Sequence, residues 1–345
     1  MQDHVHFACV VGAPRCGTTS LSRFLEAHPQ VAFSSVKEPH FFAQHDLTRT
    51  KGHELRRFVG AEYLGRYFPT RSPARPLIAE GSVSYLYAPQ RMETILRLWH
   101  DARFVIALRD PMEMLPSLHQ RLLFNGDETV TDFGQAWSLM RERAQGRSVP
   151  RTCVDSRMLQ YEELGRLGTH VGNFFRAVGK ERCFVVLLDD LSADPEGVYR
   201  GLLAFLGLPL RGYPDFAPHR QSQGYRIGSL QRFLKRPPVA TRAVLAGEKY
   251  RMRVRDLDRG NSGSAALKAV FAARKKLVNW NTAPAPPVRL SDTLRRDMRE
   301  RLSDEVIKLS GLIGRDLGHW LGGPVEKPHP RPDQALQPHQ ELELT

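Results

Sequence analysis

The chain has 345 residues, of which 41% are hydrophobic and 25% are charged, and its formal net charge at pH 7 is +13. These proportions are those of a globular protein and exclude a disordered, collagen-like or coiled-coil chain. No apolar stretch reaches the roughly 18 residues that a membrane-spanning helix needs, so we expect no membrane span.

Short apolar runs bounded by turn residues predict the strands of a parallel sheet that is buried on both faces. In chain order these runs are Phe7–Val11, Val31–Phe33, Leu77–Ala79, Phe104–Leu108 and Phe184–Leu188. Segments with the apolar period of a helix lie between them, and a further helix follows Ser291, which can cap its N-terminus. Strands that alternate with helices predict the α/β class with a doubly wound sheet.

Charge and composition are distributed unevenly along the chain. We expect one domain over residues 1–322, because no internal repeat is present, and a flexible tail over residues 323–345, which are rich in Pro, Gln and His. Residues 219–276 hold 15 Lys and Arg against three acids and so carry +12 of the +13. Such a block predicts an anionic partner, although a solvated basic helix face has the same pattern.

Two classes of partner are not expected. The basic block has neither the aromatic interleaving of single-strand binders nor zinc-finger spacing, which disfavours nucleic acid. The spacing of the four cysteines shows no C-x-x-C pair, which argues against a metal site and favours a reducing compartment; they are Cys9, Cys16, Cys153 and Cys183.

The N-terminus has no basic-then-apolar leader, so we predict a cytoplasmic protein.

A glycine-containing loop, Gly12-Ala-Pro-Arg-Cys-Gly17, follows the first predicted strand and precedes an amphipathic helix. This order brings backbone N–H groups and the positive end of a helix dipole together, which makes an anion site. The glycine spacing is that of a Walker A loop, but Thr18 and Thr19 stand where a nucleoside triphosphatase has Lys and Ser or Thr. The loop therefore predicts a site for a 5′-phosphate, with Arg15 as its cation, unless it is only a tight turn.

A second anion site is predicted at the end of the strand Phe104–Leu108, because open α/β sheets bind ligands at the carboxyl ends of their strands. The guanidinium of Arg109 can hold a phosphate with two N–H groups. The hydroxyl of Ser117, on the next helix, can donate a third hydrogen bond to that phosphate. Pro111 fits the first turn of the same helix. The alternative is that Arg109 pairs with a nearby acid and Ser117 caps a helix.

Residues 12–21, GAPRCGTTSL, resemble the 5′-phosphosulfate loop of sulfotransferases that use 3′-phosphoadenosine 5′-phosphosulfate (PAPS), above all the heparan-sulfate type and its bacterial relatives. ALRDPMEMLPSLHQ is similar to the family's 3′-phosphate motif, and GRDLGHW is similar to its usual ending. The resemblance covers roughly residues 5 to 321 and implies a P-loop-like three-layer sandwich, whose central parallel sheet has about five strands flanked by helices. It implies that PAPS binds without a metal to Pro14, Arg15, Cys16, Gly17, Thr18, Thr19, Ser20, Arg109 and Ser117.

The segment Val36–Phe42, which contains KEPHFF, resembles the part of the heparan-sulfate-type enzymes that carries the catalytic glutamate. The resemblance implies that Glu38 is the general base and that His40 assists it or orients the acceptor. Lys37 would neutralise anionic oxygens, and Arg15 would stabilise the sulfonate and the leaving phosphate. In a strand, Glu38 and His40 would point the same way.

The implied reaction is in-line transfer of the sulfuryl group of PAPS to a hydroxyl or amine of an acceptor. The glycan-modifying relatives imply a carbohydrate, or a glycosylated or small-molecule metabolite, as that acceptor. The basic, helical residues 219–282 would form an insertion on the acceptor or cofactor side, in which Arg274–Asn281 is the counterpart of a late loop that grips the 3′-phosphate. Within it, Arg251, Arg253 and Arg255 would face an acidic acceptor or surface.

The resemblance is incomplete at several positions. Relatives often have lysine where this chain has Arg15, which keeps the charge but does not easily act as an acid. Relatives also often have lysine at the position of Gly81, so we expect a second cation near the sulfonate to be absent. His119 is an alternative base, unless it lies on a helix face that only adjoins the site. Cys16 lies at a helix N-terminus, an environment that lowers the pKa of a thiol and favours its oxidation.

Two other functions stay open at this point. A P-loop kinase for a small molecule would use Asp189 or Asp190 in a Walker-B-like role, although the loop lacks the kinase lysine. A non-catalytic module that binds anions or glycans would keep the same fold.

Overall fold

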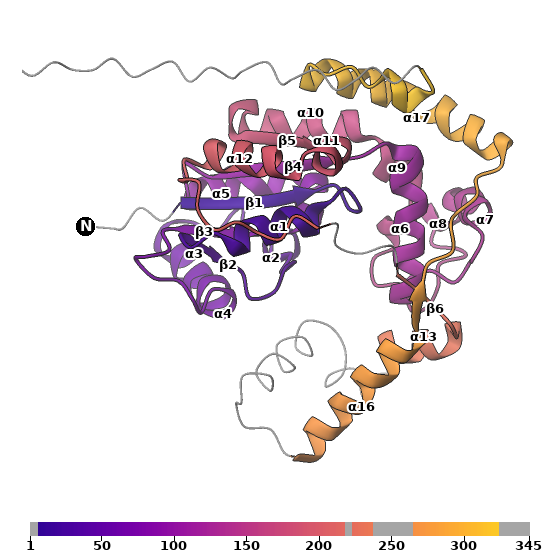
Figure 1. The fold of residues 1–345 in the computed structure, drawn as a ribbon, viewed down its shortest axis with the longest axis horizontal. Coiled ribbons are helices and arrows are strands. Elements are labelled where there is room, and N and C mark those ends of the chain that lie inside the picture. The colour runs from indigo at the N-terminus through magenta and orange to yellow at the C-terminus, as the bar shows by residue number, and fades with distance from the viewer. Residues whose placement is uncertain (1–5, 218–222, 237–264, 324–345) are drawn as a thin grey trace, which may run out of the picture.

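The computed structural model describes residues 6–217, 223–236 and 265–323, of which residues 265–271 are described in backbone only (Figure 1). Its centre is a sheet of five parallel strands in the order β2-β3-β1-β4-β5. The strands are β1 (His6–Gly12), β2 (Val31–Phe33), β3 (Leu77–Glu80), β4 (Arg103–Leu108) and β5 (Cys183–Leu187). All five strands predicted from the sequence are confirmed, each to within one residue at either end.

Fifteen α-helices accompany the sheet in the described part of the chain. They are α1 (Thr18–Ala27), α2 (Phe41–Gln44), α3 (Gly52–Val59), α4 (Gly65–Tyr67), α5 (Met92–Leu98), α6 (Pro111–Asn125), α7 (Phe133–Ser138), α8 (Met140–Ala144), α9 (Tyr161–Gly165), α10 (Leu167–Val178), α11 (Leu188–Ala193), α12 (Pro195–Leu206), α13 (Gly228–Lys235), α16 (Ala265–Asn281) and α17 (Asp292–Ile313). Two predicted features lie outside the described residues: the arginines Arg251, Arg253 and Arg255, and the tail from residue 324 onward.

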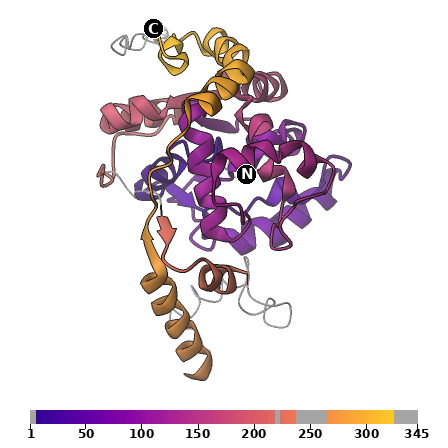
Figure 2. The ribbon, with the colours of Figure 1, turned by 90° about the vertical axis from the view of Figure 1, so that its right-hand side faces the viewer.

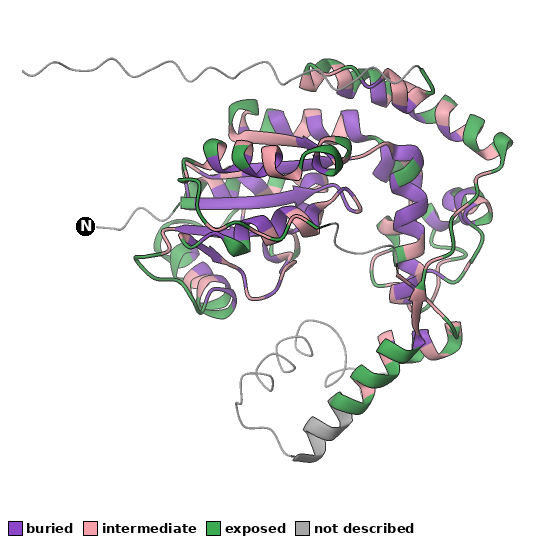
Figure 3. Cartoon of the chain, in the orientation of Figure 1, coloured by how far each residue is buried: buried purple, intermediate pink, exposed green. Residues whose placement is uncertain are grey.

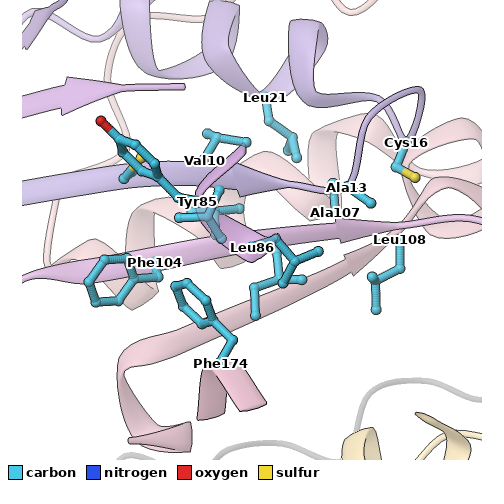
Figure 4. Close-up of a cluster of buried hydrophobic side chains, with 14 of the residues drawn as sticks. Val10, Ala13, Cys16, Leu21, Tyr85, Leu86, Phe104, Ala107, Leu108 and Phe174 are labelled. Atoms are coloured by element: carbon cyan, nitrogen blue, oxygen red, sulfur yellow. The ribbon is translucent and has the colours of Figure 1, made fainter. Parts of the chain in front are cut away.

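Helices cover both faces of the sheet, which confirms the predicted three-layer sandwich. On one face α1 and α12 meet where the rings of Phe24 and Tyr199 lie 5.5 Å apart. On the other face Phe104 of β4 packs against Phe174 of α10, with ring centroids 5.3 Å apart. Figure 4 shows Leu21 of α1 and Phe174 on opposite sides of the strands. The strands read as nearly continuous apolar runs because both of their faces are buried.

Capping residues determine where two helices begin. The hydroxyl of Ser291 accepts a hydrogen bond from the N–H of Leu294 at 3.2 Å, which confirms the predicted start of α17. At the start of α6 the carboxylate of Asp110 accepts from the N–H of Met112 at 2.8 Å, and Pro111 occupies the first turn as expected. The helix that carries Ser117 therefore begins at the end of β4, at the ligand-binding edge of the sheet.

The described part of the basic insertion forms an arm at the far end of α6. The arm consists of β6 (Gln223–Tyr225), α13, α16 and β7 (Thr282–Pro284), and its two strands pair antiparallel. Buried Asn281 donates to the side-chain oxygen of Gln231 at 3.0 Å, and Gln231 donates to the carbonyl of Phe124 at 2.7 Å. This polar network anchors the arm to α6, whereas α16 projects away from the sheet and is largely exposed (Figures 1, 2 and 3). No described helix has both the length and the apolarity that crossing a bilayer requires.

Candidate functional site

The predicted phosphate loop lies between β1 and α1, and Gly17 makes its shape possible. Gly17 has φ of 84°, and its carbonyl accepts from the N–H groups of Ser20 at 2.9 Å and Leu21 at 3.3 Å. A Cβ atom at this position would lie 2.6 Å from Cδ2 of Leu191 in α11, so only glycine lets the loop pack there. The first N–H groups of a helix have no intrahelical partner, so those at the start of α1 can bind an anion.

Arg15 joins the two predicted phosphate motifs. Its Nε donates a hydrogen bond to the hydroxyl of Ser117 at 3.0 Å, although the two residues are 102 positions apart. Burial, together with the positive charges of Arg121 and Arg109, lowers the pKa of Arg15 to about 10. Three guanidinium groups are therefore held within one electrostatic field at the edge of the sheet, an arrangement that favours a polyanionic ligand.

Arg109 forms an ion pair with Glu113. Its Nε and Nη2 donate to one carboxylate oxygen of Glu113 at 3.1 and 2.7 Å, which is the pairing that the sequence left open as an alternative. The side chain of Glu113 is 62% exposed. An exposed pair of this kind contributes only about 0–1 kcal/mol, so a phosphate can displace Glu113 from Arg109.

Lys37, Glu38 and His40 gather in the loop between β2 and α2. The prediction that Glu38 and His40 project alike from a strand is wrong, because residues 34–40 form a loop in which His40 has φ of 53°. Their side chains nevertheless meet: Nζ of Lys37 lies 2.7 Å from Oε1 of Glu38, and Nε2 of His40 lies 3.7 Å from Oε2. Burial by itself would raise the pKa of Glu38, but the hydrogen bonds and charges of His40 and Lys37 lower it to about 2.

Two serines that follow β3 hold His40 in place, and the sequence reasoning did not identify them. The backbone N–H of His40 donates to the hydroxyl of Ser82 at 2.9 Å, and its Nδ1 is hydrogen-bonded to Oγ of Ser84 at 2.8 Å. Ser82 in turn donates to the buried carboxylate of Glu80. Burial raises the pKa of Glu80, although hydrogen bonds from Ser82 and two tyrosines act to lower it. The position of these serines directly after a strand, at the ligand-binding edge, is the signal that could have found them.

A steric reason explains the glycine where relatives often have lysine. A Cβ atom at Gly81 would lie 2.7 Å from the hydroxyl of Ser22 in α1, so a longer side chain fits only if the side chain of Ser22 moves. The N–H of Gly81 donates to the carbonyl of Lys37 at 3.2 Å. The strand end is thereby joined to the loop that carries Lys37 and Glu38.

The geometry of this edge can be compared with known proteins. The sequence model of the sulfotransferase family matches residues 8–212, which is more than half of the chain. This chain belongs to the sulfotransferase family. The solved structure of a sulfotransferase from Alicyclobacillus acidocaldarius superposes on this chain with a TM-score of 0.58 at 21% sequence identity. The superposition covers 91% of this chain and 97% of the Alicyclobacillus chain. That likeness shows a shared fold.

Two curated relatives modify glycans according to their names. A bifunctional heparan sulfate N-deacetylase/N-sulfotransferase 1 of Caenorhabditis elegans is 22% identical over 222 residues, which cover 63% of this chain and 24% of that protein. Carbohydrate sulfotransferase 15 of Mus musculus is 22% identical over 244 residues, which cover 58% of this chain and 43% of that protein. This chain therefore spans about a quarter of one relative's length and less than half of the other's.

Two residues of the sulfotransferase have surroundings that differ from those expected. His119 is 1% exposed, and its Nε2 donates to the carbonyl of Val130 at 2.8 Å, which favours a core role over that of a base. Cys16 is fully buried, and its thiol donates to the carbonyl of Pro14 at 3.4 Å. Burial raises the pKa of Cys16, so the expectation of a lowered pKa is wrong: loss of solvation outweighs the positive charges of Arg109 and Arg15.

The two aspartates that follow β5 bind the C-terminal segment of the sulfotransferase. Both carboxylate oxygens of Asp190 accept from Arg315 at 3.0 Å. Oδ2 of Asp189 accepts from Nε1 of Trp320 at 3.2 Å, and Nε2 of His319 lies equally near. These contacts give both carboxylates a structural role in holding the chain end, which disfavours the Walker-B-like alternative.

The expected late loop, Arg274–Asn281, belongs to the arm. Arg274 donates from Nη2 to the carbonyl of Leu234 in α13, and Asn281 is part of the buried network at α6. Lys275 and Lys276 are exposed on α16. A role of these residues at the 3′-phosphate stays a prediction.

Proposed function

We propose that this sulfotransferase transfers the sulfuryl group of PAPS to a hydroxyl or amine of a carbohydrate or glycosylated acceptor. The hydrogen bond between Arg15 and Ser117 carries the proposal, because it joins two anion sites of one ligand at a single edge of the sheet. The loop of residues 14–20 would hold the 5′ end of PAPS, and Arg109 with Ser117 would hold its 3′-phosphate. The names of the two curated relatives support the acceptor class.

Each polar side chain at this edge has a role in the proposed transfer. When bound, PAPS supplies the sulfuryl group and leaves as adenosine 3′,5′-bisphosphate (PAP) after in-line attack by the acceptor. Glu38 takes the proton of the acceptor hydroxyl, and His40, held by Ser84, orients that hydroxyl. The guanidinium of Arg15 neutralises the charge that develops on the leaving phosphate.

Lys37 adjusts the basicity of Glu38 in this proposal. While Lys37 pairs with Glu38, the pKa of the carboxyl lies near 2, so it is ionised at neutral pH but is a weak base. Lys37 would turn its ammonium group from Glu38 toward the sulfonate of bound PAPS. The carboxylate of Glu38 would then be the stronger base that removal of the acceptor's proton requires.

Replacing Lys37 with methionine is expected to move the acidic limb of the pH profile of kcat/KM upward. The profile reports the pKa of the free enzyme's base. Loss of the Lys37 cation removes one of the two residues that lower the pKa of Glu38 against the effect of burial, so this pKa rises although His40 still lowers it. Activity should therefore fall on acidification at a higher pH in the variant than in the parent. Lys37→Arg preserves the charge and should keep the parent profile. If the methionine variant shows no shift of the limb, Glu38 is not the titrating base.

The function itself is tested by calorimetric titration with PAP and with ATP–magnesium. We expect PAP to bind, and Arg109→Met to weaken it by about 10–100-fold, as charge-assisted hydrogen bonds of about 1.5–3 kcal/mol are lost. Arg157→Met, which removes a guanidinium whose side chain is 88% exposed, should leave the affinity unchanged. Binding of ATP–magnesium without PAP would indicate a kinase. PAP binding without label transfer from PAPS to any sugar, phenol or lipid tested would indicate a binding module.

A further inference from the structure

Positively charged side chains gather at the C-terminal end of α6, beyond the proposed cofactor site. The ring of Phe124 has Nζ of Lys235 4.6 Å from its centroid and the guanidinium carbon of Arg121 5.5 Å from it. Arg274 of α16 donates to the carbonyl of Leu234, the residue before Lys235. One cation from each of α6, α13 and α16 is thus brought to the same place.

The cations of this cluster interact electrostatically with one another. Burial, together with the positive charges of Arg121, Arg274 and Arg236, lowers the pKa of Lys235 to about 8. Arg236 pairs with the carboxylate of Asp127 at the end of α6. Cations that suppress one another's charge destabilise the folded state, and an anion placed among them would reverse that effect.

The cluster adjoins the proposed cofactor site without coinciding with it. The charge of Arg121 reaches Arg15, whose pKa it lowers. Ser117 lies earlier on α6, and at a rise of about 1.5 Å per residue Phe124 is roughly 10 Å further along the helix axis. One phosphate bound to Ser117 therefore cannot also contact Lys235 above Phe124. The two positions suit two separate anionic groups.

We infer that Arg121, Lys235 and Arg274 form a second anion site, which binds a sulfate or carboxylate group of the acceptor while another group of that acceptor meets Glu38. The inference rests on the proposed function and specifies its acceptor as an acidic carbohydrate. It also assigns part of the charge of the basic insertion to a defined site. The arm carries two of the three cations, so the arm would determine which acceptors bind. Helix α6 carries both Arg121 and Ser117 and so links this anion site to the edge of the sheet where the reaction is proposed to occur.

The test measures binding of a heparin-derived tetrasaccharide and of PAP to the full chain by calorimetry. Lys235→Met should weaken binding of the tetrasaccharide by about tenfold or more. Its affinity for PAP should stay within twofold of the parent's. Arg176→Met, which removes an exposed cation of α10, should change neither and so controls for net charge. A thermal melt of each variant establishes that it is folded.

A pH series separates this site from a diffuse basic surface. The tetrasaccharide affinity of the parent should fall between pH 7 and 9, because Lys235 loses its proton in that range while the neighbouring arginines stay charged. Lys235→Arg should bind the tetrasaccharide and lose this pH dependence. Equal tetrasaccharide affinity of Lys235→Met and the parent, or no binding by the parent, would overturn the inference. Loss of PAP affinity in Lys235→Met would reassign the cluster to the cofactor. If the parent binds the tetrasaccharide through Lys235 but does not bind PAP, the anion site stands and the proposed function fails.

Discussion

Replacing Glu38 with glutamine is expected to lower kcat for sulfuryl transfer by about 10²–10⁴-fold while PAP affinity stays within twofold. Glutamine has nearly the shape of glutamate and can still accept a hydrogen bond from Lys37, but it cannot take a proton from the acceptor. The groups proposed to hold PAP, Arg15, Arg109 and Ser117, are unchanged in this variant. Single-turnover transfer of labelled sulfate measures the chemical step, and calorimetry measures the PAP affinity.

A matched control distinguishes loss of the base from a general loss of negative charge. Glu26 is exposed on α1, so Glu26→Gln should keep the parent kcat. A Glu38→Gln variant with more than about a tenth of the parent kcat would contradict the base assignment, since proton abstraction contributes at least about 10²-fold. His40→Asn would then test the neighbouring imidazole, which Ser84 holds 3.7 Å from the carboxylate.

Replacing Arg143 with methionine should lower the free energy of unfolding by about 3–5 kcal/mol. Arg143 and Glu128 form a fully buried pair with nitrogen–oxygen distances of 2.7 and 2.9 Å, and Tyr161 donates to the same carboxylate at 2.9 Å. Methionine fills much of the space but leaves a buried carboxylate without its cation. Urea unfolding at fixed pH measures the effect, and Arg157→Met, which breaks an exposed pair, should cost about 0–1 kcal/mol at most.

The pH dependence of this loss identifies its electrostatic origin. Burial by itself raises the pKa of Glu128, and the hydrogen bonds and charge of Arg143 bring it below its ordinary value. Without Arg143 the pKa of Glu128 in the folded state rises above that of the unfolded chain, so stability falls as the pH increases. The Arg143→Met loss should therefore be larger at pH 8 than at pH 5. The double variant Glu128→Gln with Arg143→Met should recover part of the stability at pH 8. A loss of equal size at both pH values would instead indicate a packing defect.

The sequence could predict features whose cause lies within a short stretch of chain. All five strands were predicted because burial on both faces requires an apolar residue at almost every position. The start of α17 at Ser291 and the first turn of α6 at Pro111 follow from capping chemistry, which involves neighbouring residues only. The phosphate loop could be read for the same reason, since the residues that shape it are contiguous.

Other features depend on residues that meet only when the chain folds. Nothing in the local pattern of Arg15 indicates Ser117 as its partner, and the side chains of Glu38 and His40 meet through a left-handed backbone at His40. The expectation of a lowered pKa for Cys16 considered the helix dipole and not the burial that the sheet imposes.

The sequence by itself determined the α/β class and the positions of the strands of this chain, and it predicted two anion motifs, because each is a local arrangement of apolar, glycine and cationic residues. The tertiary structure decided which side chains act together, because packing of the layers determines burial and proximity. It placed His119 in the core, joined Arg15 to Ser117, and brought Arg121 of α6 beside Lys235 of the arm. The net charge of +13 alone pointed only to an anionic partner. The fold brings three of the cations, Arg121, Lys235 and Arg274, together at one candidate anion site.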